Sequence, residues 1–439
     1  MCRVITLVIV AGLAILTVEM PATAQTPPAT QPTGPLTLQD ALTMARANSQ
    51  TYLSAQSAAL LAAEDKKIAR AAVLPSLSGF AQYIYTEPNG TPSGVFVAND
   101  GPKIYNMWLT SHGEVFSPQR WAEYRSAAAA EASARAKVEV AARGLVATVV
   151  QNFYTVVSSA RKLASAQQSL REAQELLDIT QKQEAGGEVA HADVVKAQIQ
   201  VEQRLRDLQE AELTALKSRL GLSVLVYPDF RDQFTVVDDL QTITPLPPMP
   251  EVVAAATGFS PDVRAAEASV QQFTADISAA RGGLLPSVSF DYFYGINANQ
   301  FAIYNPEGQR LLGSVFQAQM IVPLWSWGAT QAKLRQAHIR TNQANVELRL
   351  AQRQLQANIR TFYNEAQIAR DQVASLQRSL DLSAESLRLT RLRYQSGEAT
   401  VLEVVDAQTT LIQARNAYDD GLVRYRVAMA ALQTLTGTL

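Results

Sequence analysis

The sequence predicts a mixed α and β membrane protein built as two tandem repeats, with long coiled-coil helices and four transmembrane β-strands in each chain. Three observations predict this fold class. Several motifs occur twice along the chain, long segments without proline show a 3.5-residue apolar period, and each half contains stretches in which polar and apolar residues alternate.

The duplication is visible in three motifs. Leu-Pro-Ser at residues 74–76 recurs at 285–287, Phe-Tyr at 153–154 recurs at 362–363, and Gly-Glu at 187–188 recurs at 397–398. The separation between the copies stays between 209 and 211 residues, which is too long for a solenoid unit and indicates a duplicated half. We therefore expect a first structural repeat at residues 36–246 and a second at residues 247–439.

The first residues are predicted to direct secretion. Arg3 precedes an apolar run from Val4 to Val18, and the small residues 22–24 are of the kind that a signal peptidase accepts. The alternative is a membrane-anchoring helix, but that needs roughly twenty apolar residues. We expect a signal peptide at residues 1–24, followed at residues 25–35 by a disordered leader rich in Pro, Thr and Gln.

Long helices are predicted where proline is missing, between Pro118 and Pro228 and after Pro323. Apolar residues recur in steps of four and three at positions 355, 359, 362, 366, 369, 373, 376 and 380, which is the seam of a left-handed coiled coil. In the first half we expect the seam at positions 149, 153, 156, 160, 163, 170 and 177. A helix over residues 119–184 would be about 100 Å long.

Glycine turns divide the long helices. Gly187 and Gly397 each follow a predicted helix, where glycine supplies the left-handed residue that ends a helix. Second helices are expected at residues 190–220 and 401–435, so each half contains a helical hairpin with a glycine turn at its tip. Each half also opens with a predicted helix, at residues 38–73 and 251–284, that stops at the Leu-Pro-Ser motif.

After each Leu-Pro-Ser motif the apolar period changes to two. Polar and apolar residues alternate at residues 76–83, 105–116, 287–294 and 316–322, and the turn-rich segments 87–102 and 297–313 separate the members of each pair. Alternation over about ten residues with many tyrosines is typical of transmembrane β-strands. The alternative is a soluble hairpin in each half, but an isolated two-stranded hairpin is only marginally stable.

The composition gives no indication of catalysis or of nucleic-acid binding. The formal net charge is −2, and the three histidines (His112, His191 and His338) do not belong to a motif. The only cysteine is Cys2, which would leave with the signal peptide. We therefore predict a protein that is not an enzyme and has no cofactor, no metal site and no nucleic-acid partner.

The order of these elements and the segment from Gly397 to Gln408, which includes Glu403-Val-Val-Asp406, resemble the TolC-like outer-membrane efflux protein family. The likeness covers residues 36–439. It implies a homotrimer in which three chains pool four strands each into one twelve-stranded β-barrel in outer-membrane lipid, while their helices form a periplasmic α-barrel. It also implies a passive exit duct of a tripartite efflux pump or a type I secretion system, with a periplasmic adaptor and an inner-membrane transporter as partners.

The resemblance assigns roles near the glycine turns. Glu403 and Asp406 share one helix face and would line the periplasmic end of the tunnel as a gate and selectivity ring, with Asp193 in the matching place of the first half; the alternative is that they are solvated surface carboxylates. Lys196 stands at the counterpart of Asp406. Gly187 and Gly397 would form the tips to which the adaptor docks. Some members carry an arginine latch where this chain has Ala399, so no latch of that kind is expected.

A second class of function remains open at this point. A periplasmic coiled-coil scaffold without a channel would also have long helical hairpins, provided that the alternating stretches form soluble hairpins. Closure of the strands within a membrane separates the two hypotheses.

Overall fold

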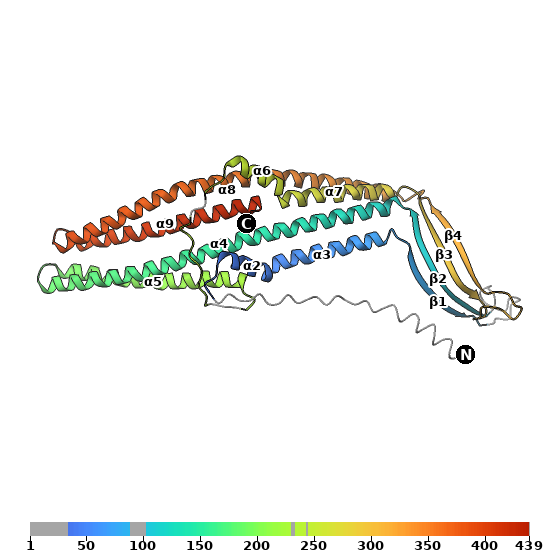
Figure 1. Cartoon of the computed structure of the whole chain (residues 1–439), viewed down its shortest axis with the longest axis horizontal. Coiled ribbons are helices and arrows are strands. Elements are labelled where there is room, and N and C mark those ends of the chain that lie inside the picture. The colour runs from blue at the N-terminus through green and yellow to red at the C-terminus, as the bar shows by residue number, and fades with distance from the viewer. Residues whose placement is uncertain (1–33, 88–101, 230–232, 243–244, 439) are drawn as a thin grey trace.

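The protein is an elongated molecule with helices along most of its length and a β-sheet at one end (Figure 1). The computed structural model describes residues 34–87, 102–229, 233–242 and 245–438. The predicted signal peptide, most of the predicted leader and most of the segment 87–102 lie outside the described residues, and the predictions for them stand as made.

The long helices confirm the sequence prediction. The helices are α2 (Leu38–Asn48), α3 (Gln50–Ala71), α4 (Pro118–Ala185), α5 (His191–Val226), α6 (Met249–Phe259), α7 (Pro261–Gly282), α8 (Ala329–Gln395) and α9 (Val401–Thr436). The bounds of α4 and α9 agree with the expected ones to within one residue. Helix α5 runs six residues past its expected end at residue 220.

The helix that opens each half differs from the prediction, because it is broken in two. Ser49 separates α2 from α3, and Ser260 separates α6 from α7; both serines have extended backbones, with ψ of 114° and 112°. Each serine hydroxyl accepts a hydrogen bond from a backbone N–H of the following helix, donated by Tyr52 and Val263 at 3.4 Å. A serine that caps the next helix ends the previous one. Pro261 at the start of α7 also favours a new helix there, because the backbone N–H that proline lacks would have no partner within the helix.

The four predicted strands are confirmed and form one antiparallel sheet in the order β1-β2-β3-β4. The strands are β1 (Ser76–Tyr85), β2 (Lys103–Phe116), β3 (Ser287–Ala298) and β4 (Leu312–Ile321). Each repeat contributes one hairpin, and the two hairpins join where β2 pairs with β3. Within the chain, β1 and β4 are the outer strands of the sheet.

The register gives the sheet one polar and one apolar face, since directly paired residues point to the same side. The polar face carries Ser76, Ser78, Gln82, Asn106, Thr110, His112, Glu114, Ser289, Asp291, Gln317 and Gln319. The apolar face carries Leu77, Ala81, Tyr83, Met107, Leu109, Phe290, Tyr292, Tyr294, Phe316, Ala318 and Met320.

The main hydrophobic core lies at the middle of the molecule, where the two halves meet. It joins α2, α6 and the ends of α5 and α9 to the central parts of α4 and α8, and its largest fully buried side chains include Phe153, Leu222 and Tyr425. Leu36 enters this core and pairs with the segment between α5 and α6, through hydrogen bonds of 2.8 Å and 2.9 Å to Thr235 and Val237. This core therefore ties the start of the first repeat to the connection between the repeats.

The coiled-coil seam is confirmed in α8 but only partly in α4. In α8 the seam positions from Leu355 to Leu380 are buried or half-buried. The same spacing continues through Ser383, which is buried and donates its hydroxyl to the carbonyl of Ser379, to the buried Leu387. In α4 the expected seam is buried at residues 149, 153 and 156, exposed at Ala160, and half-buried at residues 163, 170 and 177. Beyond residue 159 the fully buried positions are instead Ser169, Ala173, Leu176 and Thr180.

The altered seam of α4 follows from its neighbours. Beyond residue 156, α4 packs against α5 and also meets α9 through Arg161 and α8 through Thr180, whereas a helix of a two-stranded coiled coil faces a single partner. Its buried stripe therefore turns around the helix and uses small residues that let several helices approach. One 18-residue window of α4 has a mean hydropathy of 1.3 and is 44% buried inside the chain. That partial burial against other helices is typical of a helix in a packed bundle.

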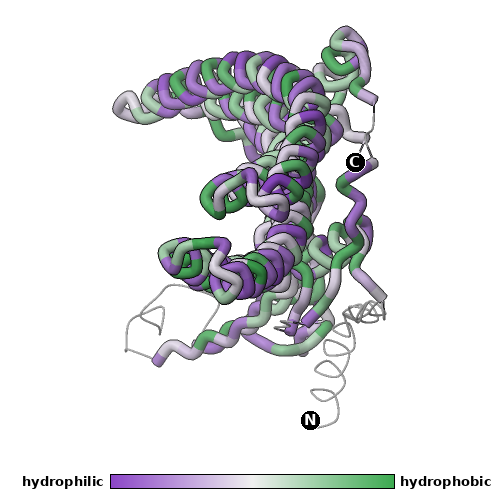
Figure 2. The backbone as a smooth tube through the Cα atoms, turned by 90° about the vertical axis from the view of Figure 1, so that its left-hand side faces the viewer, coloured by the Kyte–Doolittle hydropathy of each residue, from purple (hydrophilic) through white to green (hydrophobic). Residues whose placement is uncertain are grey.

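Viewed along the long axis from the hairpin tips, the helices form a curved wall in which polar and apolar positions are intermixed (Figure 2). In each half the helices run in hairpins, α4 with α5 and α8 with α9, and α4 also contacts α9. The wall therefore has the two hairpins side by side and does not enclose a space by itself.

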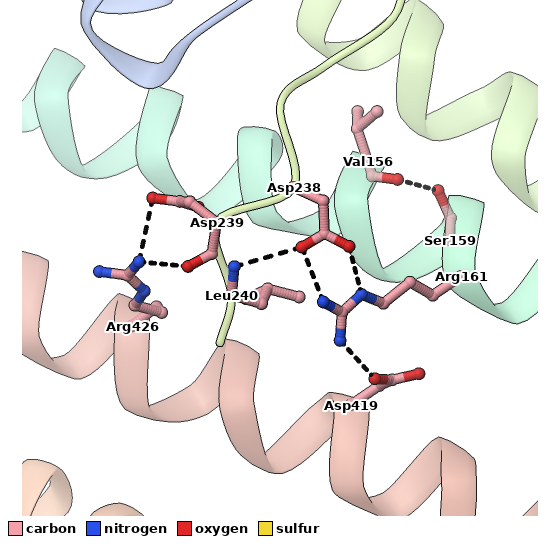
Figure 3. A network of polar contacts seen from close by, with 8 residues as sticks. All are labelled: Val156, Ser159, Arg161, Asp238, Asp239, Leu240, Asp419 and Arg426. Atoms are coloured by element: carbon pink, nitrogen blue, oxygen red, sulfur yellow. Dashed lines mark hydrogen bonds and ion pairs between the residues drawn. The ribbon is translucent and has the colours of Figure 1, made fainter. Parts of the chain in front are cut away.

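A network of ion pairs fastens the segment between the repeats to α4 and α9 (Figure 3). Arg161 on α4 donates to both oxygens of Asp238, at 2.5 Å and 2.8 Å, and to Asp419 on α9, at 2.9 Å. Arg426 on α9 donates to the carboxylate of Asp239 at 3.0 Å. One arginine therefore links the two helical hairpins and the connection between them.

We predict that Arg161→Met lowers the free energy of unfolding by about 2 kcal/mol, because the largely buried Asp419 loses its charged partner in this network. This value is smaller than for a fully buried pair, because solvent reaches both side chains in part. The neighbouring substitution Lys162→Met is the matched control. It breaks the more exposed pair with Asp420, at 2.7 Å, which is worth less than about 1 kcal/mol. Denaturant unfolding of both variants in one detergent checks the difference. Equal midpoints would show that the Arg161 network contributes no more than a surface pair.

Candidate functional site

The hairpin tips have the glycine turns that the sequence predicts. Gly187 and Gly397 have φ of +79° and +75°, a conformation that side chains with a Cβ rarely adopt. Glu188 N–H donates to the carbonyl of Gln183, and Glu398 N–H to that of Arg393, both at 2.8 Å. A Cβ added at either glycine would have no neighbouring atom within 4 Å, so backbone conformation, not space, is what favours glycine at these positions.

The two tips lie against each other. A cavity of about 500 Å³ between them is lined by Glu188 and Asp193 from the first hairpin and by Tyr394, Gly397 and Thr400 from the second, among others. The structure therefore brings Asp193 close to the second glycine turn, although the two positions are more than 200 residues apart in the sequence. Both predicted tips belong to one surface at the end of the molecule.

A buried hydrogen bond joins the hairpins just behind the tips. The hydroxyl groups of Tyr394 on α8 and Thr180 on α4 are 3.0 Å apart, and both residues are almost completely buried. Burial raises the pKa of Tyr394, while the bond to Thr180 acts in the opposite direction. A buried bond between two neutral hydroxyls stabilises by roughly 1 kcal/mol, and here it connects the two halves.

Glu403 has a structural role that the sequence analysis missed. Its carboxylate accepts from Thr400 N–H at 3.1 Å, while the Thr400 hydroxyl accepts from Glu403 N–H at 3.4 Å, which forms a capping box at the start of α9. Arg393 lies 3.3 Å from the same carboxylate. The bond from the Thr400 backbone is the largest cause that lowers the pKa of Glu403, and the charge of Arg393 adds to it.

The other two acidic positions are less constrained. Asp406 is exposed on α9, and Asp193 is half-buried in the first turn of α5, 3.1 Å from Lys196. The structure places all three carboxylates at the tip end of the molecule. Of the polar groups around them, Thr400 was detectable in the sequence, because Thr-x-x-Glu is the pattern of a capping box. Tyr394 and Arg393 were not, since their partners depend on how the hairpins pack.

The opposite end of the molecule has the surface of a membrane-embedded sheet. On the apolar face, Leu77, Phe316 and Met320 are between 66% and 73% exposed. Aromatic residues gather at both ends of the strands: Trp121, Trp325 and Trp327 near the helices, and Tyr83, Tyr85 and Tyr304 at the far end, all of them exposed. An outward apolar band between two aromatic girdles is typical of transmembrane β-barrels.

The three histidines lie apart from one another. His112 on the polar face of the sheet is 2.8 Å from Asp291, His191 at the start of α5 is 2.7 Å from Glu184, and His338 lies on α8. Within the described ranges, no group of three or more His, Cys, Asp or Glu side chains is placed to hold a metal ion.

Comparison with known proteins identifies the family. The outer membrane efflux protein family matches twice, at residues 41–226 and 253–438. Outer membrane protein TolC of Vibrio cholerae serotype O1 is 22% identical over 399 residues, which cover 90% of this chain and 89% of that protein. Proteases secretion protein PrtF of Dickeya chrysanthemi is 24% identical over 395 residues, which cover 86% of this chain and 82% of that protein.

The fold is shared with solved structures. The crystal structure of the Campylobacter jejuni CmeC outer membrane channel superposes with a TM-score of 0.82 at 17% identity, covering 91% of this chain and 85% of that chain. The likeness includes long helices and a short sheet in one chain. The two family matches fall one in each repeat and together span most of the sequence. The chain therefore belongs to the outer membrane efflux protein family, which is a family of outer-membrane channels and not an enzyme family.

Proposed function

We propose that three copies of this chain assemble into the passive outer-membrane exit duct of a tripartite efflux pump or a type I secretion system. The observation that carries the proposal is the sheet, which has one polar face, one exposed apolar face and two outer strands, and which continues directly into the long helices. Cargo would pass through the duct unchanged, and the energised transporter would select it.

Oligomerisation follows from membrane physics. In lipid every backbone N–H and C=O must be paired, so a spanning sheet has to close into a barrel. Four strands are too few to enclose a lumen. The outward edges of β1 and β4 must therefore pair with further copies of the chain, and the number three comes from the resemblance to the family. In that barrel the apolar face would meet lipid and the polar face would line the lumen.

The exposed apolar face of the sheet argues against the alternative of a soluble periplasmic scaffold. A soluble periplasmic scaffold would leave Leu77, Phe316 and Met320 in water on one continuous face, beside three exposed tryptophans. An exposed apolar area of this kind marks a surface that another phase or partner covers. Lipid covers it in the proposed barrel.

The first test concerns assembly. We expect the mature protein to purify from membranes as a detergent-dependent trimer and to form conducting channels in planar bilayers, because only the closed oligomer pairs the edges of β1 and β4. Light scattering with the detergent contribution subtracted, together with bilayer recording, measures both properties. A monomer that stays soluble without detergent would rule out the exit duct and support the scaffold.

We further propose that the tips around Gly187 and Gly397 dock to a periplasmic adaptor, and that Asp193, Glu403 and Asp406 line the gate. Their common position at the end of the molecule farthest from the sheet supports this assignment (Figure 1). In a trimer the carboxylates of Glu403 and Asp406 would form two rings of three. Rings of like charge in a constriction favour ions of opposite charge.

The second test concerns the tip turn. Gly397→Val should weaken adaptor-dependent export, since a β-branched residue resists φ of +75°. Gly397→Asn is the matched control and should export nearly as well as the parent, because asparagine tolerates the left-handed region. Export assays in cells that carry the complete pump measure both variants. Unchanged export by Gly397→Val would exclude this turn as a docking or gating element.

The third test concerns the acidic rings. Glu403→Gln with Asp406→Asn should reduce cation selectivity and weaken block by trivalent cations added from the tip side, while glutamine preserves the capping box. Asp381→Asn is the control, because this exposed carboxylate lies on α8 and outside the proposed rings. It should change neither the cation selectivity nor the block. If single-channel recordings of the double variant match the parent, the gate lies elsewhere.

The pH dependence of the capping box at Glu403 has a defined sign. The folded-state pKa of Glu403 is lowered from its ordinary value of 4.5, so in each chain the stabilisation by the charged capping box is fully present above that value. It is lost as the pH falls through the lower folded-state pKa. We therefore expect this contribution of Glu403 to the start of α9 to persist from neutral pH down to about pH 5 and to weaken below it. Denaturant unfolding of the parent and of Glu403→Gln across that pH range measures it.

A further inference from the structure

An aromatic cluster interrupts the polar face of the sheet. Phe80 stacks on Trp108 with ring centroids 4.9 Å apart, and Trp108 meets Phe293 edge-on at 6.3 Å. The register places the three rings on the same face as His112 and Asp291, because Phe80 pairs with Trp108, and Phe293 follows Asp291 by two residues. Polar residues fill most other positions on this face, so the cluster needs a separate explanation.

Beside the cluster the sheet is hollow. Gly295 and Gly313 lie directly opposite each other on β3 and β4, and Gly295 in turn lies opposite Trp108. Two neighbouring positions without side chains leave a cavity of about 340 Å³, whose lining includes Trp108, Phe293, both glycines and Val315. This volume lies within the range of sites for small molecules.

The two glycines differ in what they tolerate. A Cβ on Gly295 would come within 2.4 Å of the backbone of Trp108, so this glycine is required for the close approach of β2 and β3. A Cβ on Gly313 would meet nothing within 4 Å, and its φ is not positive. Strand packing therefore does not explain Gly313, which keeps the hollow open.

On this face of the sheet the strands carry formal negative charges and no lysine or arginine. The formal negative charges on this face are Asp291, next to His112, and Glu114, 3.4 Å from Arg120 of α4. On the four strands the one lysine or arginine is Lys103, at the start of β2 and on the opposite face. Aromatic faces attract cations and stack on planar rings.

We infer that the hollow beside Trp108 is a transient cargo site for planar aromatic cations. The inference rests on the proposed function, since the polar face lines a lumen only in the closed barrel. The indole and the ring of Phe293 would form the walls and the backbone at Gly295 and Gly313 the floor. Asp291, two residues before Phe293 on the same face, would place a negative charge beside the Phe293 wall. Binding must be weak, because a duct conducts only when its sites release what they bind.

The experiment uses the full-length trimer in planar bilayers, with proflavine, a planar tricyclic cation, as the probe. Proflavine should interrupt the open-channel current reversibly. Gly313→Val fills the hollow with a residue that suits a strand, and Trp108→Leu removes its wall; each should weaken the block at least tenfold. Phe316→Leu, on the apolar face of β4, is the matched control and should leave the block unchanged.

Two further measurements make the outcomes distinct. Tetraethylammonium, a cation without an aromatic plane, should act equally on the parent and all variants, so an effect confined to proflavine excludes general narrowing of the lumen by valine. Normal conductance with proflavine block that is the same in Gly313→Val and the parent would overturn this inference and leave the exit duct intact. Failure of the parent to conduct would instead refute the proposed function, and this inference with it.

Discussion

The structure depends on one constraint, that a four-stranded sheet with an apolar face cannot be complete as a single chain. An unpaired backbone N–H or C=O group at a strand edge is costly in lipid, so β1 and β4 require partner strands. The duplication serves the same constraint, since each repeat supplies one hairpin and the pairing of β2 with β3 joins them. The long helices follow the strands along the chain and form a curved wall (Figure 2).

The middle of the molecule holds this arrangement together. Helix α4 contacts helices of both repeats and carries the core residues Val149 and Phe153 as well as Arg161, which pairs with Asp238 and Asp419. The tip end has a smaller core of its own, in which Leu176 of α4 packs with Tyr394 of α8 and Val401 of α9, beside the buried bond between Tyr394 and Thr180. The larger core therefore lies at the centre, and a rearrangement of the tip end would disturb the smaller one.

Much of the fold was predictable because its helices and strands follow short apolar periods in the sequence. The 3.5-residue period gave the seam of α8, the two-residue period gave all four strands, and the glycines gave the tips. The breaks at Ser49 and Ser260 were missed although both serines are recognisable caps. The seam of α4 beyond Val156 could not be predicted from one helix, because α5, α8 and α9 share its surface there. For the same reason the partners of Tyr394 and Arg393 depended on packing that no local pattern encodes.

Glu403 shows why a functional carboxylate at a helix start is hard to assign from sequence. The same side chain closes the capping box with Thr400, pairs with Arg393 and stands one turn before Asp406. Its side-chain oxygens therefore serve the fold of the tip even where no ring exists. In the proposed trimer the cap would fix the carboxylate in place, so that the gate charge is held by the backbone of its own helix. Glu403→Gln removes the charge and keeps the cap, so it tests the gate alone. Truncation of the side chain removes the cap as well, so its effect would not be specific to the gate.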